Sequence, residues 1–230
     1  MIRIIGFDAD DTLWHNENIF DRAQERYRGL LAKYHPADAV NRALFATEMR
    51  NLPHYGYGIK GFMLSAVETA IALTDGAVSA AEIRAIIALG QEMLAHPVEV
   101  LPGVGAAVAQ LAADHRLLVI TKGDLRDQER KMAASGLAAH FFAVEILSEK
   151  DQAAYARVLA RHGVAPAEFA MVGNSVKSDI LPVLALGAAG VHIPYHLTWQ
   201  HERAGETPCD HPRFRAVADI GQLAAAVAAL

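Results

Sequence analysis

The sequence lacks the cysteines, basic runs and long apolar segments that would point to several classes of protein. Cys209 is the only cysteine among 230 residues, so the chain can form no intramolecular disulfide. The longest mostly apolar stretch, residues 180–193, is shorter than the roughly 20 residues that a transmembrane helix needs. The chain does not open with a charged leader, an apolar core and a cleavage site. We therefore expect a cytoplasmic protein with no membrane partner.

Charge is low and evenly spread. The formal net charge is −5 and the isoelectric point is about 6.1, with no block of Lys or Arg. This argues against a nucleic-acid partner. Hydrophobic residues make up 53% and charged residues 20%, a composition typical of a globular protein with a substantial core. The length allows one large domain or two unequal ones, and the sequence is compatible with a monomer or a homodimer.

A short apolar run near the N-terminus ends abruptly in carboxylates. Ile4, Ile5 and Phe7 are typical of a strand buried on both faces, and Asp8 and Asp10 follow it. A spacing of two in extended backbone puts both carboxylates on one side. Two carboxylates about 5 Å apart repel by a few kcal/mol at an effective dielectric near 20. A hard divalent cation would relieve that repulsion, whereas the alternative is an acidic turn that only caps the next helix.

Helical periodicity fills residues 15–97, and strands alternate with helices from residue 98 onward. Four helices are expected near 16–34, 36–52, 60–73 and 79–96. Later strands are expected at 116–120, 142–147, 169–172 and 188–193. Alternating strands and helices predict a parallel sheet with right-handed crossovers. The sequence thus predicts an α/β core from residues 1–14 and 98–230, with an all-helical domain inserted at 15–97.

Polar side chains follow four of the expected strands. Besides the first acidic pair, Thr121 ends the second strand, Lys150 follows the third, and Asn174 and Asp179 follow the fourth. Each alone has an ordinary interpretation as a turn residue, a helix cap or a solvated lysine. The carboxyl ends of parallel strands meet at one edge, where ligands bind. Their convergence at that edge predicts a site.

The residue types at this edge suit phosphoryl transfer, which needs mainly positioning and charge neutralisation. Asp8 can attack an electrophilic phosphorus or carbon and form a covalent intermediate. Asp10 can protonate the leaving group and later deprotonate water. The groups expected to bind the substrate are Thr121, Lys122, Gly123 and Lys150, through a hydroxyl, backbone N–H groups and a fixed cation. The groups expected to supply oxygens to a hard divalent cation are Asp8, Asp10, Asp179 and Asn174.

These motifs resemble those of the haloacid dehalogenase-like hydrolase superfamily. The D-x-D-x-T motif matches residues 8–12, and a Thr or Ser at a strand end matches Thr121. A lone Lys matches Lys150, and a G-x-x-x-x-x-D variety of the fourth motif matches residues 173–179. The resemblance implies a Rossmann-like core with a helical cap at 15–97, Mg²⁺ dependence and an aspartyl-enzyme intermediate. It predicts a phosphohydrolase acting on a small phosphorylated substrate.

Two positions bear on the choice of reaction. Many relatives carry an acidic pair in the fourth motif, whereas this chain has Asn174 first, so Asp179 is the stronger metal ligand. The founding dehalogenases lack an Asp where this chain has Asp10, which favours a phosphatase. A phosphomutase and a carbon–halogen hydrolase on the same core remain alternatives. A non-catalytic phospho-receiver domain also groups Asp, Thr and Lys at strand ends, but it has no helical insertion of this length.

Overall fold

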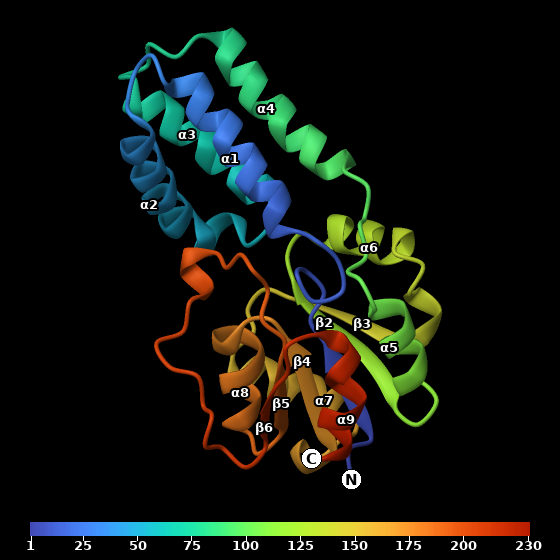
Figure 1. The fold of residues 1–230 in the computed structure, drawn as a ribbon. Helices are drawn as coiled ribbons and strands as arrows, with labels where there is room; N and C mark the ends of the chain where they lie inside the picture. The colour runs from blue at the N-terminus through green and yellow to red at the C-terminus, as the bar shows by residue number, and fades with distance from the viewer. The chain divides into compact units, whose positions relative to one another are not determined.

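The computed structural model describes residues 1–230, and six parallel strands form its sheet in the order β3-β2-β1-β4-β5-β6 (Figure 1). The strands are β1 (Ile4–Phe7), β2 (Arg116–Lys122), β3 (Phe141–Leu147), β4 (Phe169–Gly173), β5 (Ala189–His192) and β6 (Phe214–Ala216). This arrangement confirms the expected α/β, Rossmann-like fold. The sequence did not predict β6, because three residues are too few to show a strand periodicity.

The first strand lies in the middle of the sheet and is buried along its whole length. It pairs with β2 on one side and β4 on the other. Gly6 is needed there, because a Cβ atom would come within 2.6 Å of the Phe169 ring. From β1 the sheet extends in one direction through β2 and β3, and in the other through β4, β5 and β6. Ligands bind where such an order reverses, which here is beyond the ends of β1 and β4.

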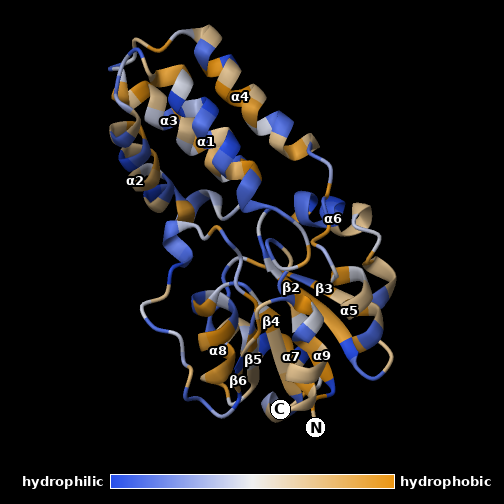
Figure 2. Cartoon of the chain, in the orientation of Figure 1, coloured by the Kyte–Doolittle hydropathy of each residue, from blue (hydrophilic) through white to orange (hydrophobic).

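Helices cover both faces of the sheet. They are α5 (Val104–Leu111), α6 (Leu125–Ala134), α7 (Gln152–Arg161), α8 (Leu181–Leu184) and α9 (Leu223–Ala228). Alternate residues of β1 point to opposite faces: Ile5 and Phe7 join the core that includes α5 and α9, and Ile4 joins the core that includes α7. Figure 2 shows the hydrophobic strands between these helices. The sheet therefore rests on two apolar layers that hold its strand ends in place.

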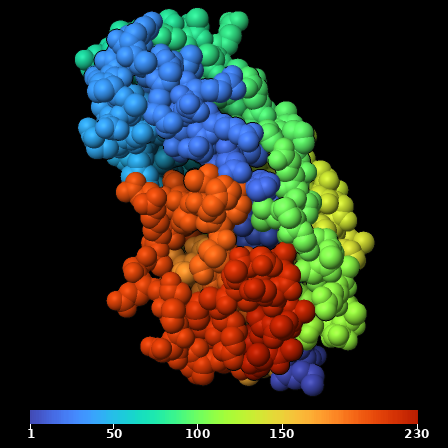
Figure 3. All heavy atoms as spheres, in the orientation of Figure 1, coloured from blue at the N-terminus to red at the C-terminus, as the bar shows by residue number.

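The chain after β4 does not form one regular helix over residues 176–185. A π-helical turn, η3 (Val176–Ile180), comes first, and the short α8 follows. Pro182 in α8 lacks the backbone N–H that a continuous helix would use. The segment between β5 and β6, residues 193–213, is largely irregular and contains the 3₁₀ turn η4 (Gln200–Glu202). Much of it lies at the surface, as the orange spheres in Figure 3 show.

The chain forms two compact units. The core unit comprises Met1–Glu17, Val98–Lys122 and Gln128–Leu230, and the helical unit comprises Asn18–Pro97 and Gly123–Asp127. The sequence placed the boundaries at 14/15 and 97/98, and it placed 123–127 in the core.

No helix has the length and apolar character needed to traverse a bilayer.

The helical unit has its own hydrophobic core. Its helices are α1 (Glu17–Leu31), α2 (Ala37–Tyr55), α3 (Ile59–Leu73) and α4 (Ala80–Ala95). Tyr27, Leu44, Phe62 and Ile86 are among the residues that pack together. A capping box begins α4: the side chains of Ser79 and Glu82 each accept from the other residue's backbone N–H. Segment 123–127 is tied to α3 by an ion pair of 2.9 Å between Lys60 and Asp124.

Candidate active site

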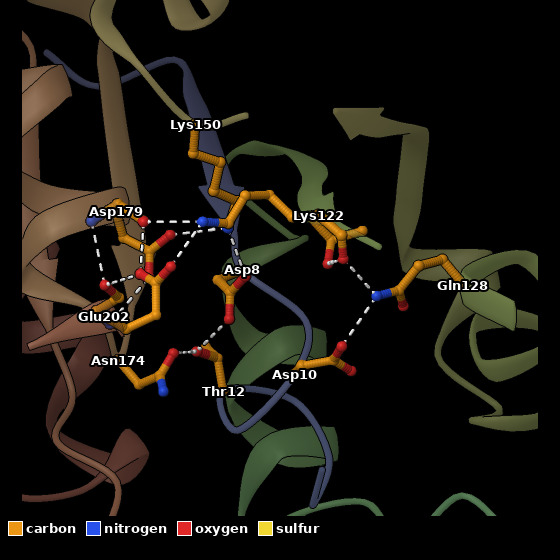
Figure 4. A network of polar contacts seen from close by, with 12 residues as sticks. Asp8, Asp10, Thr12, Lys122, Gln128, Lys150, Asn174, Asp179 and Glu202 are labelled. Carbon is orange, nitrogen blue, oxygen red and sulfur yellow. Dashed lines mark hydrogen bonds and ion pairs between the residues drawn. The ribbon is translucent and has the colours of Figure 1, made fainter. Parts of the chain in front are cut away.

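Three of the expected site residues meet at the carboxyl end of β1. Asp8 is buried, and its backbone N–H donates to the carbonyl of Val172 at the end of β4, at 2.8 Å. The Lys150 ammonium donates to Oδ1 of Asp8 and, at 2.8 Å, to Oδ1 of Asp179 (Figure 4). Thr12 Oγ donates to the other Asp8 oxygen at 3.0 Å. The structure thus joins residues from the ends of β1 and β3 and from η3 in one buried cluster.

This cluster holds more negative than positive charge. The side chains of Asp8, Lys150 and Asp179 are all at least nine-tenths buried. Burial raises the pKa of Asp8 to about 7; Lys150 opposes that rise and Asp179 adds to it. Burial disfavours the charged form of Lys150, yet Asp179 and Asp8 together hold its pKa well above the ordinary value. One ammonium therefore faces two carboxylates, and the unbalanced negative charge disfavours the ionised form of Asp8.

Replacement of Asp8 by Asn should change how stability depends on pH. Since the pKa of Asp8 is raised from 3.8 to about 7, its contribution to stability is full below the unfolded value and is lost as pH rises through about 7. Asn does not titrate and escapes that loss. We expect the melting temperature of Asp8→Asn, relative to wild type, to be higher near pH 8 than near pH 5, in buffer with a chelator. A melting-temperature difference that does not change with pH would show that Asp8 is not a carboxyl group with a raised pKa.

A glycine lets Asp179 approach the end of β4. A Cβ atom on Gly173 would lie 2.2 Å from Oδ2 of Asp179, so any other residue would displace this carboxylate. The backbone N–H of Ser175 donates to the same oxygen at 3.0 Å. Asn174 turns its Oδ1 toward Thr12 Oγ, 3.3 Å away. The fourth motif thus sets one carboxylate and one amide oxygen beside Asp8.

The residues present fit a hard divalent cation. Asp8, Asp179 and Asn174 offer oxygen atoms, which such a cation prefers, and the excess buried negative charge would be offset by it. No three side chains of His, Cys, Asp or Glu gather anywhere in residues 1–230 in a way that could hold a metal. A cation here would therefore rely on Asn174 and main-chain oxygens to complete its ligands.

Asp10 lies apart from Asp8 and has a lysine of its own. Its Oδ1 accepts from Trp14 Nε1 at 2.7 Å and from Lys131 Nζ at 2.6 Å, and its Oδ2 accepts from Gln128 Nε2 at 2.9 Å. The extended spacing that would put both carboxylates on one side is not kept, because the chain turns at residues 9–13 and directs Asp10 toward α6.

The expected substrate-binding residues have different surroundings. Thr121 is buried at the end of β2, and its hydroxyl donates to the carbonyl of Lys122 at 3.3 Å. The Lys122 ammonium contacts Glu202 at 2.7 Å and Glu149 at 3.2 Å, so carboxylates already surround it. Gly123 has a φ of +135°, which favours glycine, and it belongs to the helical unit. Only Lys150 of this set contacts Asp8 directly.

The sequence analysis did not identify the residues that form hydrogen bonds to Asp10 and to the fourth motif. Gln128 and Lys131 are three apart in α6, which puts them on one helix face, so their pairing with a strand-end carboxylate had a detectable signal. Trp14 follows Asp10 by only four residues, so its contact with Asp10 could also have been predicted from the sequence. Glu202 had no such signal, because it lies in an irregular segment far along the chain.

Comparison with known proteins gives the family of the chain. The family model for haloacid dehalogenase-like hydrolases matches residues 2–187. No curated protein sequence shows significant similarity. A haloacid dehalogenase-like family hydrolase from Xanthomonas campestris is 43% identical, with a TM-score of 0.90 over 99% of this chain and 91% of the other.

Two more distant structures share the fold only. A 2-haloacid dehalogenase from Pseudomonas syringae is 22% identical, with a TM-score of 0.65 over 99% of each chain. A predicted phosphoglycolate phosphatase from Haemophilus somnus is 16% identical, with a TM-score of 0.63 over 98% of each chain. The fold therefore accompanies both kinds of hydrolase, and the choice between them has to come from the site.

Proposed function

This chain belongs to the haloacid dehalogenase-like hydrolases, and we propose that within that family it is a Mg²⁺-dependent phosphohydrolase acting on a small phosphorylated metabolite. The observation that carries the proposal is the buried cluster of Asp8, Asp179 and Lys150, in which one ammonium faces two carboxylates. Attack by a carboxylate on a phosphate dianion meets like-charge repulsion, so such a reaction needs further positive charge.

Asp8, Asp179 and the Asn174 amide would hold the Mg²⁺ ion. When bound, it would neutralise negative charge on the phosphoryl group and on the attacking carboxylate. Lys150 supplies the fixed protein cation beside Asp8, and Thr121 supplies a hydroxyl at the end of the neighbouring strand. Burial of the cluster strengthens these electrostatic interactions relative to water.

The reaction proceeds in two displacements. In the first, an Asp8 carboxylate oxygen forms a bond to phosphorus while the bond between phosphorus and the ester oxygen breaks, and Asp10 gives its proton to the departing oxygen. In the second, Asp10 takes a proton from water, the water oxygen attacks phosphorus, and Asp8 is released as a carboxylate. For this role Asp10 exchanges one of its contacts with α6 for the leaving-group oxygen.

Hydrolysis of a carbon–halogen bond is the second candidate, and one observation favours it. Asp10 is held by Lys131, Gln128 and Trp14, away from Asp8. Loss of a halide ion requires no proton donor, so that reaction would leave Asp10 in this arrangement. The two buried carboxylates of Asp8 and Asp179 weigh against it. They favour a bound cation, and a carbon–halogen substrate has no phosphate group for that cation to neutralise.

A substrate panel with and without Mg²⁺ separates the two. We expect phosphate release from p-nitrophenyl phosphate and from at least one class of sugar phosphate, nucleotide or phospho-acid. That release should stop with excess chelator and return when Mg²⁺ is added in excess of the chelator. Halide release from 2-chloropropionate should stay at background. Chelator-insensitive halide release without phosphatase activity would establish the second candidate instead.

A further inference from the structure

A carboxylate outside the recognised motifs reaches into the core unit from segment 193–213. Glu202, in η4, is largely buried, with 15% of its side chain exposed. Its Oε1 accepts from Lys122 Nζ at 2.7 Å. Its Oε2 accepts from Ser175 Oγ at 2.7 Å and from Ser178 Oγ at 2.5 Å. Every near polar partner of this carboxylate is thus a donor from the end of β2 or from the fourth motif.

Those two serines bracket the turn that presents Asp179. The backbone N–H of Ser175 donates to Oδ2 of Asp179, and Ser175 Oγ also accepts from the backbone N–H of Ser178. Asp179 in turn contacts Lys150, which contacts Asp8. A continuous series of hydrogen bonds therefore runs from Glu202 to the proposed nucleophile (Figure 4). Groups that orient metal ligands in this way commonly change metal affinity when they are removed.

Glu202 also balances a cation beside the site. The Lys122 side chain is 11% exposed and follows Thr121 directly, and Glu202 lies nearer to it than Glu149 does. Burial alone would raise the pKa of Glu202, but Lys122 and the two serine hydroxyls lower it to about 2. Glu202 is consequently ionised throughout the neutral range. Without it, the buried Lys122 ammonium would lose the nearer of the two carboxylates that pair with it.

We propose that Glu202 is a positioning residue for the metal site: it fixes the 175–179 turn and neutralises Lys122, so that Asp179 is presented to Mg²⁺. The inference rests on the proposed function, because it assigns a role toward the cation of that reaction. Glu202 itself contacts neither Asp8 nor Lys150 in the hydrogen-bond network and takes no part in the chemical steps.

The test compares Glu202→Gln and Glu202→Ala with wild type in two Mg²⁺ titrations. The first follows the rise in melting temperature as Mg²⁺ is added without substrate, and the second follows phosphate release from p-nitrophenyl phosphate. We expect the half-saturating Mg²⁺ concentration to rise about tenfold to a hundredfold in both. Relative to wild type, turnover of the variants should be closer to normal at saturating Mg²⁺ than at low Mg²⁺. A general loss of structure would lower turnover at both concentrations. Glu206→Gln is the matched control, since Glu206 is exposed in the same segment.

Half-saturating concentrations within twofold of wild type would overturn the proposal. If the Glu202 variants do not fold, Ser175→Ala and Ser178→Ala each remove one of the two hydroxyls that donate to Glu202 and keep the backbone N–H groups. Each should then raise the half-saturating concentration severalfold, and no change in either would overturn the role. A wild type with no response to Mg²⁺ in either titration would overturn both this inference and the proposed function. A normal wild-type response with unchanged variants would overturn the role of Glu202 alone.

Discussion

Asp8→Asn should lower the turnover of p-nitrophenyl phosphate by at least about 10⁴-fold, the scale expected when a covalent nucleophile is lost. The amide oxygen is a poor nucleophile and cannot form the aspartyl-phosphate. The substitution nearly conserves volume, and it removes one of the two carboxylates that share Lys150. The folded structure should therefore survive, and the loss should lie in turnover. Steady-state rates with Mg²⁺, together with circular dichroism, make the measurement.

Asp21→Asn is the matched control for this variant, because Asp21 is exposed in α1 and undergoes the same chemical change. It should keep wild-type rates. If Asp8→Asn retained a tenth of the wild-type rate, Asp8 could not be the nucleophile, and the order of events proposed for this site would be wrong.

Lys150→Met should damage both stability and activity. It removes the only cation that contacts Asp8 and Asp179 and leaves two buried carboxylates unpaired. Breaking a buried pair in this way costs about 3–5 kcal/mol of the free energy of unfolding. Loss of one fixed positive group at a charge-developing centre lowers turnover by about 10²–10³-fold. Urea unfolding and steady-state rates at saturating Mg²⁺ measure the two effects.

Lys33→Met serves as the control for the lysine substitution. Lys33 pairs with Glu82, but 64% of its side chain is exposed. Exposed pairs contribute about 1 kcal/mol or less, so this variant should unfold at nearly the wild-type urea concentration. A Lys150→Met protein as stable and as active as wild type would mean that the Asp8–Lys150–Asp179 cluster is not the centre of the site.

The strand ends were the part of the site that the sequence could predict. An apolar run followed by Asp8, and later strands followed by Thr121, Lys150 and Asp179, predict an edge where these groups meet, because parallel strands align their carboxyl ends. The structure confirms the sheet and brings Asp8, Lys150 and Asp179 into contact. The apolar runs that mark the strands and the parallel direction of those strands were sufficient to predict that these side chains meet.

The remaining features depend on geometry that periodicity does not carry. Asp10 shares the first motif, yet the turn at residues 9–13 directs it to Lys131, and a rule for extended strands cannot anticipate that turn. The π-helical turn at 176–180 lies just before Pro182, which lacks a backbone N–H, and no repeat of apolar positions predicts such a turn. Glu202 reaches the site from an irregular segment, where spacing predicts nothing about contacts.

The most direct test of the account is to look for the covalent intermediate. Wild-type protein mixed with a phosphomonoester and Mg²⁺, and quenched in acid within one turnover, should carry one phosphoryl group on the peptide that contains Asp8, seen by mass spectrometry. The same peptide from Asp8→Asn should carry none. Turnover of the phosphomonoester with an unmodified Asp8 at every quench time, or a carbon-linked adduct of Asp8 formed only from a haloacid, would contradict it.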